Sequence, residues 1–263
     1  MRKTKIEFSG VRAKLYDEAL EKYPLAREED IQLMEKYLNP QKGEHILGFG
    51  EGNGFFCKVI AESVGSTGNY LVTDPSPDQL NNLKSKMSYS WVDVKEIGAE
   101  ELNVVPRSFD KAWSFGALHH CQNQTLSVKQ IYDSLRYGGK AIICDVFQGS
   151  ALAKHFDVQV ARYCVTGHEV KFLSDEFAKS LCFLAGFEDT KVKIVEINPK
   201  WKFESEEALG EFVYKLHAMT KLPGNLKEKI NETIDGCKKI LGVEYKDGMY
   251  NLNWPMKMII AEK

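Results

Sequence analysis

The feature that most constrains this chain is a short apolar segment that runs into closely spaced glycines. Residues 45–49 are mostly apolar, and Gly50, Gly52 and Gly54 follow at every second position. A helical pattern of apolar residues then begins near Phe56. Glycine lets the backbone adopt positive φ and lets a ligand approach the main chain closely. The segment therefore predicts a strand, a tight turn and the N-terminus of a helix.

An acidic residue ends the next apolar segment. Residues 70–73 are apolar or β-branched, and Asp74 follows them, 20 residues beyond Gly54. In a β-α-β unit this places a carboxylate at the tip of the neighbouring strand, where it can bind two ribose hydroxyl groups. The glycine loop and Asp74 together predict a nucleoside-binding half-site.

The glycine spacing separates two classes of nucleotide-binding protein. The dinucleotide fingerprint is G-x-G-x-x-G. Counted from Gly48, its sixth position is Asn53, and counted from Gly50 it is Phe55, so neither register fits. We therefore keep an NAD-dependent oxidoreductase only as an alternative.

Length, charge and cysteine content narrow the remaining classes. A chain of 263 residues with 43% hydrophobic residues can build one large α/β domain with additions. The net charge of −2 gives no sign of a nucleic-acid partner or an anionic membrane. The first five residues are basic but lack the apolar region of a signal peptide, and no apolar run reaches membrane-spanning length. Six cysteines without a C-x-x-C pair suit a reducing compartment. We expect a cytoplasmic protein, monomeric or homodimeric.

Strand and helix patterns alternate between residues 44 and 147, which predicts a parallel, doubly wound sheet. We expect further elements outside this region: helices within 11–38, 174–185, 201–221 and 226–241, and strands at 190–197 and 255–261. Aromatic residues near the end of the chain are candidates to wall an acceptor pocket or to form core: Trp201, Phe203, Phe212, Tyr214, Tyr250 and Trp254.

Four segments resemble motifs that occur together in one family. They are the G-x-G-x-G loop, the acid-ended strand at residues 72–80, the Phe-Asp…Leu-His-His pattern at 108–120 and the Leu-Arg-x-Gly-Gly crossover at 135–139. The chain resembles the class I S-adenosylmethionine-dependent methyltransferases, of the small-molecule, ubiquinone/menaquinone-methyltransferase-like type.

The resemblance implies a fold and a domain plan. We expect a Rossmann-like, doubly wound, seven-stranded α/β sheet, mostly parallel with an antiparallel last strand, and with helical cap and lid insertions. Residues 1–263 would form a single domain with the cofactor-binding core at about 40–147. Residues 1–39, 148–172 and 201–241 would supply helical cap and acceptor-pocket elements.

The resemblance also implies S-adenosylmethionine as cofactor and assigns its binding residues. They are expected to contact the methionine part (Arg27, Gly50, Glu51, Gly52, Asn53, Gly54), the ribose (Asp74, Pro75), the adenine (Gly98, Ala99, Glu100) and the floor of the site beside the methyl group (Ser114, Phe115, His119).

Two positions depart from the family pattern. Acids usual in the family are replaced by Gly48, in the first strand, and by Gly98, before the adenine loop. Glu51 and Glu100 are candidates to compensate for them. The departures leave open a non-catalytic or non-methylating S-adenosylmethionine-binding protein as an alternative.

The expected reaction is methyl transfer to a hydroxyl, amine or carbon of a small, partly apolar metabolite. Transfer to oxygen or nitrogen needs a group that accepts a proton, and His155, His168 and His119 are the candidates for this base, in that order. Alignment of the acceptor alone can also supply most of the acceleration. His119, His120 and Cys121 lack a further ligand at metal-site spacing, so we expect no metal.

Overall fold

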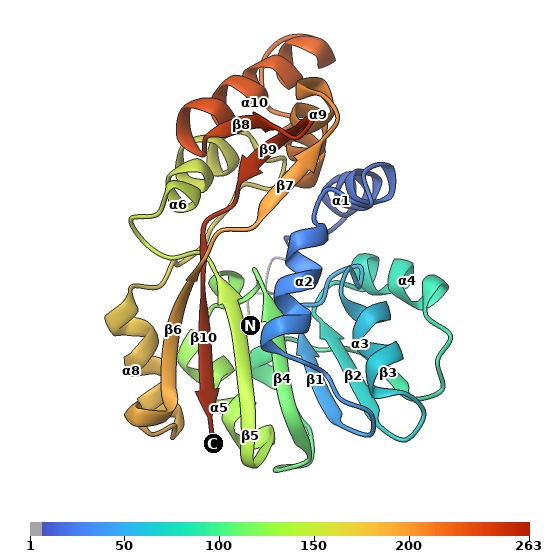
Figure 1. The fold of residues 1–263 in the computed structure, drawn as a ribbon, viewed down its shortest axis with the longest axis vertical. Coiled ribbons are helices and arrows are strands. Elements are labelled where there is room, and N and C mark those ends of the chain that lie inside the picture. The colour runs from blue at the N-terminus through green and yellow to red at the C-terminus, as the bar shows by residue number, and fades with distance from the viewer. Residues whose placement is uncertain (1–6) are drawn as a thin grey trace. The chain divides into compact units, whose positions relative to one another are not determined.

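The computed structural model describes residues 7–263, and the basic residues considered above for an export signal lie outside the described part. The chain forms two compact units, which we describe separately (Figure 1). The core unit contains Met34–Gln148, Val170–Ile197 and Met256–Lys263. The insert unit contains the described residues up to Leu33, together with Gly149–Glu169 and Asn198–Pro255.

The core unit is built on a seven-stranded sheet with the order β3-β2-β1-β4-β5-β10-β6. β1 pairs in parallel with β2 and β4, whereas β10 pairs antiparallel with β5 and β6. The strands are β1 (His45–Phe49), β2 (Asn69–Asp74), β3 (Val92–Glu96), β4 (Phe109–Phe115), β5 (Leu135–Asp145), β6 (Val192–Ile197) and β10 (Met256–Glu262). This topology confirms the predicted mostly parallel sheet with an antiparallel last strand.

Helices cover the sheet because its strands are apolar on both sides, as parallel strands are when both faces are buried. One face buries Leu47, Phe49 and Ile143 against Ile131 of α5 and Leu181 of α8. The helices of this unit are α3 (Cys57–Val64), α4 (Pro77–Lys86), α5 (Gln124–Ser134) and α8 (Asp175–Ala185), and α2 (Glu28–Tyr37) enters it from Met34 onward.

The insert unit combines helices with a small antiparallel sheet of order β7-β9-β8. Its elements are α1 (Val11–Lys22), α6 (Ala151–His155), the π-helix η3 (Phe156–Val160), α7 (Ala161–Tyr163), β7 (Lys200–Phe203), α9 (Glu206–Leu216), α10 (Leu226–Ile240), β8 (Val243–Lys246) and β9 (Met249–Asn253). Trp201 stacks on Trp254 with ring centroids 3.7 Å apart, and Phe212 meets Trp201 edge-on at 5.5 Å. These buried aromatic residues therefore form the core of this unit.

A buried ion pair also lies in the insert unit. Arg27 Nε donates to Asp30 Oδ2 at 2.6 Å, and Trp201 Nε1 donates to the same oxygen at 3.1 Å. Both charged side chains are nearly inaccessible to solvent. Breaking such a pair leaves an uncompensated buried charge, so we expect it to fix the start of α2 against β7.

The prediction of a helix from residue 201 is wrong at its beginning, and the prediction did not include the strands β8 and β9. Residues 200–203 form β7, and α9 begins at Glu206 after Ser205, whose side chain accepts a hydrogen bond from Ala208 N. β8 and β9 flank a hairpin turn at Asp247 and Gly248, which have φ of 52° and 79°. Asp-Gly with both residues at positive φ is a typical hairpin turn, so the sequence did carry this signal.

No helix within residues 7–263 has both the length and the apolar character required to cross a bilayer.

We predict that Gly210→Ala destabilises the protein by about 1 kcal/mol or more. A Cβ at Gly210 would lie 2.5 Å from Ile234 Cγ1 and 2.9 Å from the backbone oxygen of Ile230, where α9 packs on α10. This overpacking exceeds the ~1 kcal/mol that alanine gains over glycine inside a helix. Urea unfolding measures the effect, with exposed Glu232→Ala on α10 as a control expected within ~0.5 kcal/mol. An unchanged free energy of unfolding would contradict close packing here.

Candidate active site

The glycine loop between β1 and α3 needs its glycines for both conformation and space. Gly50, Gly52 and Gly54 have φ of 64°, 56° and 82°, which side-chain-bearing residues rarely adopt. A Cβ on Gly50 would lie 2.2 Å from the Cβ of Ala117, and one on Gly54 would lie 2.2 Å from Leu83 Cδ1. The loop therefore takes the strand–turn–helix form that its spacing predicts, packed closely against the segment that follows β4 and against α4.

Asp74, at the end of β2, holds the loop in place. Its Oδ2 accepts a hydrogen bond from Gly52 N at 2.9 Å, and its Oδ1 accepts one from Ser76 N at 2.8 Å. Burial raises the pKa of Asp74 to about 6, although the two amide hydrogen bonds act to lower it. One carboxylate thus joins the glycine loop to the turn before α4. Its contact with a ribose remains a prediction.

Glu51 occupies the space where a side chain at position 48 would lie. A Cβ on Gly48 would be 2.4 Å from Glu51 Oε1 and 2.7 Å from Tyr70 Oη. Cys57 Sγ lies 3.7 Å from Glu51 Oε2 and donates to it. Burial raises the pKa of Glu51 to about 8. The carboxyl group missing from the strand is therefore replaced in space by one from the loop.

The predicted adenine loop is tied to the segment that precedes α5. Gly98 precedes the short helix η1 (Ala99–Glu101), and Glu100 Oε1 accepts hydrogen bonds from Gln122 N at 2.8 Å and Asn123 N at 3.2 Å. A Cβ on Gly98 would lie 4.0 Å from the Cβ of Pro75, so these two expected contacts are neighbours. Glu100 is thus already engaged by backbone amides of the core unit.

Several buried polar atoms of the core unit lack partners among residues 7–263. They include the amide atoms Oε1 and Nε2 of Gln79 and Oε1 of Glu51, both beside the loop, and Oγ of Ser114 on β4. Gln79 Oε1 would lie 3.3 Å from a Cβ on Gly52, which places it against the loop. Buried polar groups are nearly always hydrogen-bonded, so these atoms fit a ligand rich in donors and acceptors. The amides of Gly52 and Gly54 already donate hydrogen bonds to Asp74 and to the backbone oxygen of Glu51, so ligand contacts in this loop must come chiefly from side chains.

His119 is joined to an acid that sequence reasoning did not single out. The helix η2 (Leu118–His120) follows β4, and His119 Nδ1 lies 2.5 Å from Asp145 Oδ1, at the end of β5. His119 N donates to Asp145 Oδ2 at 3.0 Å, and Val146 N donates to Oδ1 at 2.6 Å. A carboxylate on Nδ1 favours the tautomer that has its proton there, which leaves Nε2 able to accept a proton.

The other two candidate bases lie in the insert unit. His155 is fully buried, with ring centroids of His217 and Trp254 at 5.8 Å and 6.1 Å, and its ring nitrogens have no partner among the described residues. Burial lowers its pKa to about 4. His168 is buried with its ring 4.8 Å from that of Phe156. Their roles as bases remain predictions.

Arg27 also lies in the insert unit, where Asp30 is its carboxylate partner. Its guanidinium lies 5.1 Å from the ring centroid of Trp201. The predicted contact of Arg27 with a methionine carboxylate is not tested by this pairing. The other predicted cofactor residues all belong to the core unit.

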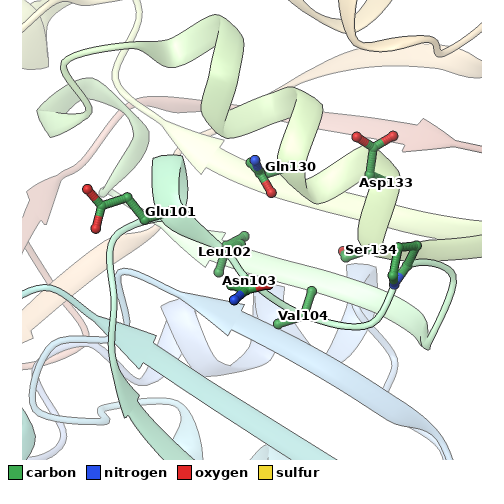
Figure 2. A pocket seen from close by; sticks show the side chains of 8 residues that line it. Glu101, Leu102, Asn103, Val104, Gln130, Asp133 and Ser134 are labelled. Carbon is green, nitrogen blue, oxygen red and sulfur yellow. The ribbon is translucent and has the colours of Figure 1, made fainter.

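A hollow of about 320 Å³ lies elsewhere in the core unit, beside α5 (Figure 2). It is lined by residues 101–104, Pro106, Gln130, Asp133 and Ser134. Neither the glycine loop nor Asp74 contributes to its lining. The hollow is therefore distinct from the candidate site.

The strand order, the glycine loop and the acid at the end of β2 together define a class I, Rossmann-like methyltransferase fold. Residues 47–143 match the family described as "Methyltransferase domain". The fold and this match agree with the class I S-adenosylmethionine-dependent methyltransferase domain that the sequence predicts.

Individual relatives agree with this class. The chain is 26% identical over 159 residues to 2-methyl-6-phytyl-1,4-hydroquinone methyltransferase 1 of Oryza sativa, covering 60% of this chain and 45% of the relative. It is 25% identical over 182 residues to arsenite methyltransferase of Halobacterium salinarum, covering 65% and 44%. The chain thus spans less than half the length of these relatives. Phosphoethanolamine N-methyltransferase 2 of Haemonchus contortus, solved with S-adenosylmethionine, shares the fold with a TM-score of 0.68 at 16% identity, covering 98% of this chain and 58% of that one.

We predict that His155, buried as a neutral ring, makes a contribution to the free energy of unfolding that is lost as the pH is lowered from about 6.5 towards 4. Its pKa is about 4 in the folded chain and ~6.5 when unfolded, so the unfolded chain binds more protons between these values. The contribution lost between pH 7 and pH 5 is about 2 kcal/mol.

Urea unfolding of the wild type and of His155→Gln at both pH values isolates this contribution. His217 has a lowered pKa and acts with the same sign, whereas the raised pKa values of Glu51 and Asp74 act with the opposite sign. The difference between the two proteins cancels these shared contributions. Equal pH dependence in both would mean that His155 is not buried as a neutral ring.

Proposed function

We propose that the protein catalyses S-adenosylmethionine-dependent methyl transfer to a small, partly apolar acceptor. The observation that carries the proposal is the glycine loop held by Asp74, with unpartnered polar atoms of Gln79 and Glu51 beside it. Asp74 would bind the ribose, the segment from Gly98 to Glu100 the adenine, and the glycine loop the methionine part. When bound, the cofactor supplies an activated methyl group, so the protein must chiefly align the acceptor and exclude water.

We propose a hydroquinone-like ring as the acceptor, with transfer to a ring carbon or a hydroxyl. Relatives named for phytyl-hydroquinone and phytyl-naphthoquinone methylation support this class. Arsenite, named for another relative, is a soft centre that binds thiolates. Burial raises the pKa of Cys57 well above its usual value and those of Cys121, Cys182 and Cys237 to about 12, which disfavours thiolates at these four cysteines. The balanced charge supports an enzyme without a nucleic-acid partner, and six cysteines without a C-x-x-C pair suit the cytoplasm.

Where a proton must leave the acceptor, we propose His119 as the base and Asp145 as its positioning residue. Asp145 would hold the Nδ1 proton, and Nε2 would take the proton from the acceptor hydroxyl as its oxygen or an adjacent ring carbon attacks the methyl group, with S-adenosylhomocysteine as the leaving group. In transfer to carbon, the methylated ring carbon then loses its own proton and the oxygen regains one, which restores the aromatic hydroquinone. Of the three candidate histidines, His119 has the carboxylate partner that such a role requires. His155 and His168 remain alternative bases.

Turnover on a panel of acceptors tests the activity itself. The full chain would be incubated with S-adenosylmethionine and short-chain prenyl hydroquinones, simple amines or arsenite, and mass spectrometry would follow S-adenosylhomocysteine and a gain of one methyl group. Methylated hydroquinone is the expected product. Tight cofactor binding without product on any acceptor would instead support a non-catalytic binding protein, and binding of NAD alone would support an oxidoreductase.

We predict that Asp74→Asn weakens S-adenosylmethionine binding about 10- to 100-fold, because charged hydrogen bonds to the ribose and to the loop are lost. Titration calorimetry measures the affinity. The matched control is Asp78→Asn, an exposed acid in the first turn of α4, which should bind within about twofold of the wild type. Unchanged affinity in Asp74→Asn would exclude the ribose assignment.

We predict that His119→Ala lowers kcat on a hydroxyl acceptor by ~10²-fold or more, with partial recovery at higher pH as the acceptor ionises. Asp145→Asn should lower kcat with little change in KM and alter the pH profile, because the amide no longer favours the same tautomer. His120→Gln is the neighbouring control and should stay within about threefold. If His155→Ala or His168→Ala shows the pH-relieved loss while His119→Ala does not, the base assignment moves to that residue.

A further inference from the structure

We propose that Glu51 couples ligand binding to proton release: its carboxyl group, seated in the space left by Gly48, ionises and gives its proton to solvent when a cationic ligand occupies the glycine loop. The inference rests on the proposed function, because S-adenosylmethionine carries both an ammonium and a sulfonium group. It assigns to Glu51 a binding role that depends on pH.

The first support is geometric. A Cβ on Gly48 would be 2.4 Å from Glu51 Oε1 and 2.8 Å from Glu51 Cγ, so the two positions cannot both bear a side chain in this arrangement. The absence of a side chain in β1 is what allows Glu51 to turn inward from the loop. Its carboxyl group is consequently about nine-tenths buried, at 9% exposure.

The second support is the set of groups that face this carboxyl. Tyr70 from β2 and Cys57 from α3 offer hydrogen bonds, and Asp74 at the end of β2 adds a like charge. None of the groups that shift the pKa of Glu51 within residues 7–263 is a cation, and Oε1 has no hydrogen-bond partner there. A desolvated acid without a counter-ion favours its neutral form, which agrees with its pKa of about 8.

The third support comes from linkage between the two charges. A cation placed beside Oε1 stabilises the ionised form and so lowers the pKa of Glu51. Binding of that cation must then release a proton, and raising the pH must strengthen binding until Glu51 is ionised in the free protein. Asp74, with its pKa near 6, is already largely ionised at pH 7.5 and contributes little to this release.

Titration calorimetry of the full chain with S-adenosylmethionine at pH 7.5, in phosphate and in Tris, counts the protons released, because the two buffers differ in ionisation enthalpy. The wild type should release about half a proton or more relative to Glu51→Gln, and its affinity should rise on the order of tenfold between pH 6.5 and pH 8.0. Glu62→Gln, an exposed acid on α3, is the matched control and should behave as the wild type.

Moving the carboxyl group from position 51 to position 48 tests whether binding depends on the charge itself or on the structure of the loop. Glu51→Ala should weaken binding. Gly48→Asp added to Glu51→Ala should restore part of it by placing a carboxylate on β1, provided that Tyr70→Phe also removes the hydroxyl that would lie 2.7 Å from the new Cβ. Gly48→Asp alone should destabilise the protein, because Glu51 fills that space. Equal proton release by the wild type and Glu51→Gln would overturn this inference alone, whereas a wild type that binds neither S-adenosylmethionine nor S-adenosylhomocysteine would overturn the proposed function.

Discussion

The candidate site depends on the hydrogen bond between the Asp74 carboxylate and the Gly52 amide. Three glycines at positive φ form a loop that has little conformational preference of its own. Asp74 fixes this loop from the neighbouring strand and, through Ser76, fixes the start of α4 as well. The close packing of Gly50 on Ala117 and of Gly54 on Leu83 further restricts the conformation of the loop. The arrangement of Glu51 and Gln79 around it follows from that one position.

Much of the fold could be predicted from local pattern, and the exceptions have physical causes. Strands β1 and β2 and the second halves of β4 and β5 are mostly apolar and are followed by glycine or end in an acid, so their positions along the chain could be recognised. β7 was taken for helix because Trp201 and Phe203 suit either element, and only pairing with β9, about 50 residues later, decides between them. Asp145 ends β5 as Asp74 ends β2, but its partner His119 follows a different strand, and a pattern along the chain does not display that pairing.

The candidate site was predicted in a similar way. The glycines and Asp74 can be recognised in the sequence because their spacing is typical of a nucleoside-binding loop and the acid that follows it. Gln79 gave no signal, since a glutamine in the first turn of a helix is ordinarily exposed, and only the turn made by Asp74 and Ser76 directs it against Gly52. The sequence already suggested that Glu51 could compensate for the acid missing at Gly48. The burial that raises the pKa of Glu51 to about 8 follows only from the three-dimensional structure.

One detail of the sheet bears on how such a protein can change over time. Ile197 and Met256 are direct partners in the antiparallel pair of β6 and β10, although residues 198–255 separate them along the chain. That segment therefore leaves and re-enters the sheet at a single rung, as a hairpin loop does. The entropy of closing a loop grows only slowly with its length. A change in the length of this segment therefore alters the cost of closing it very little, and every strand of the seven-stranded sheet can keep its register through such a change.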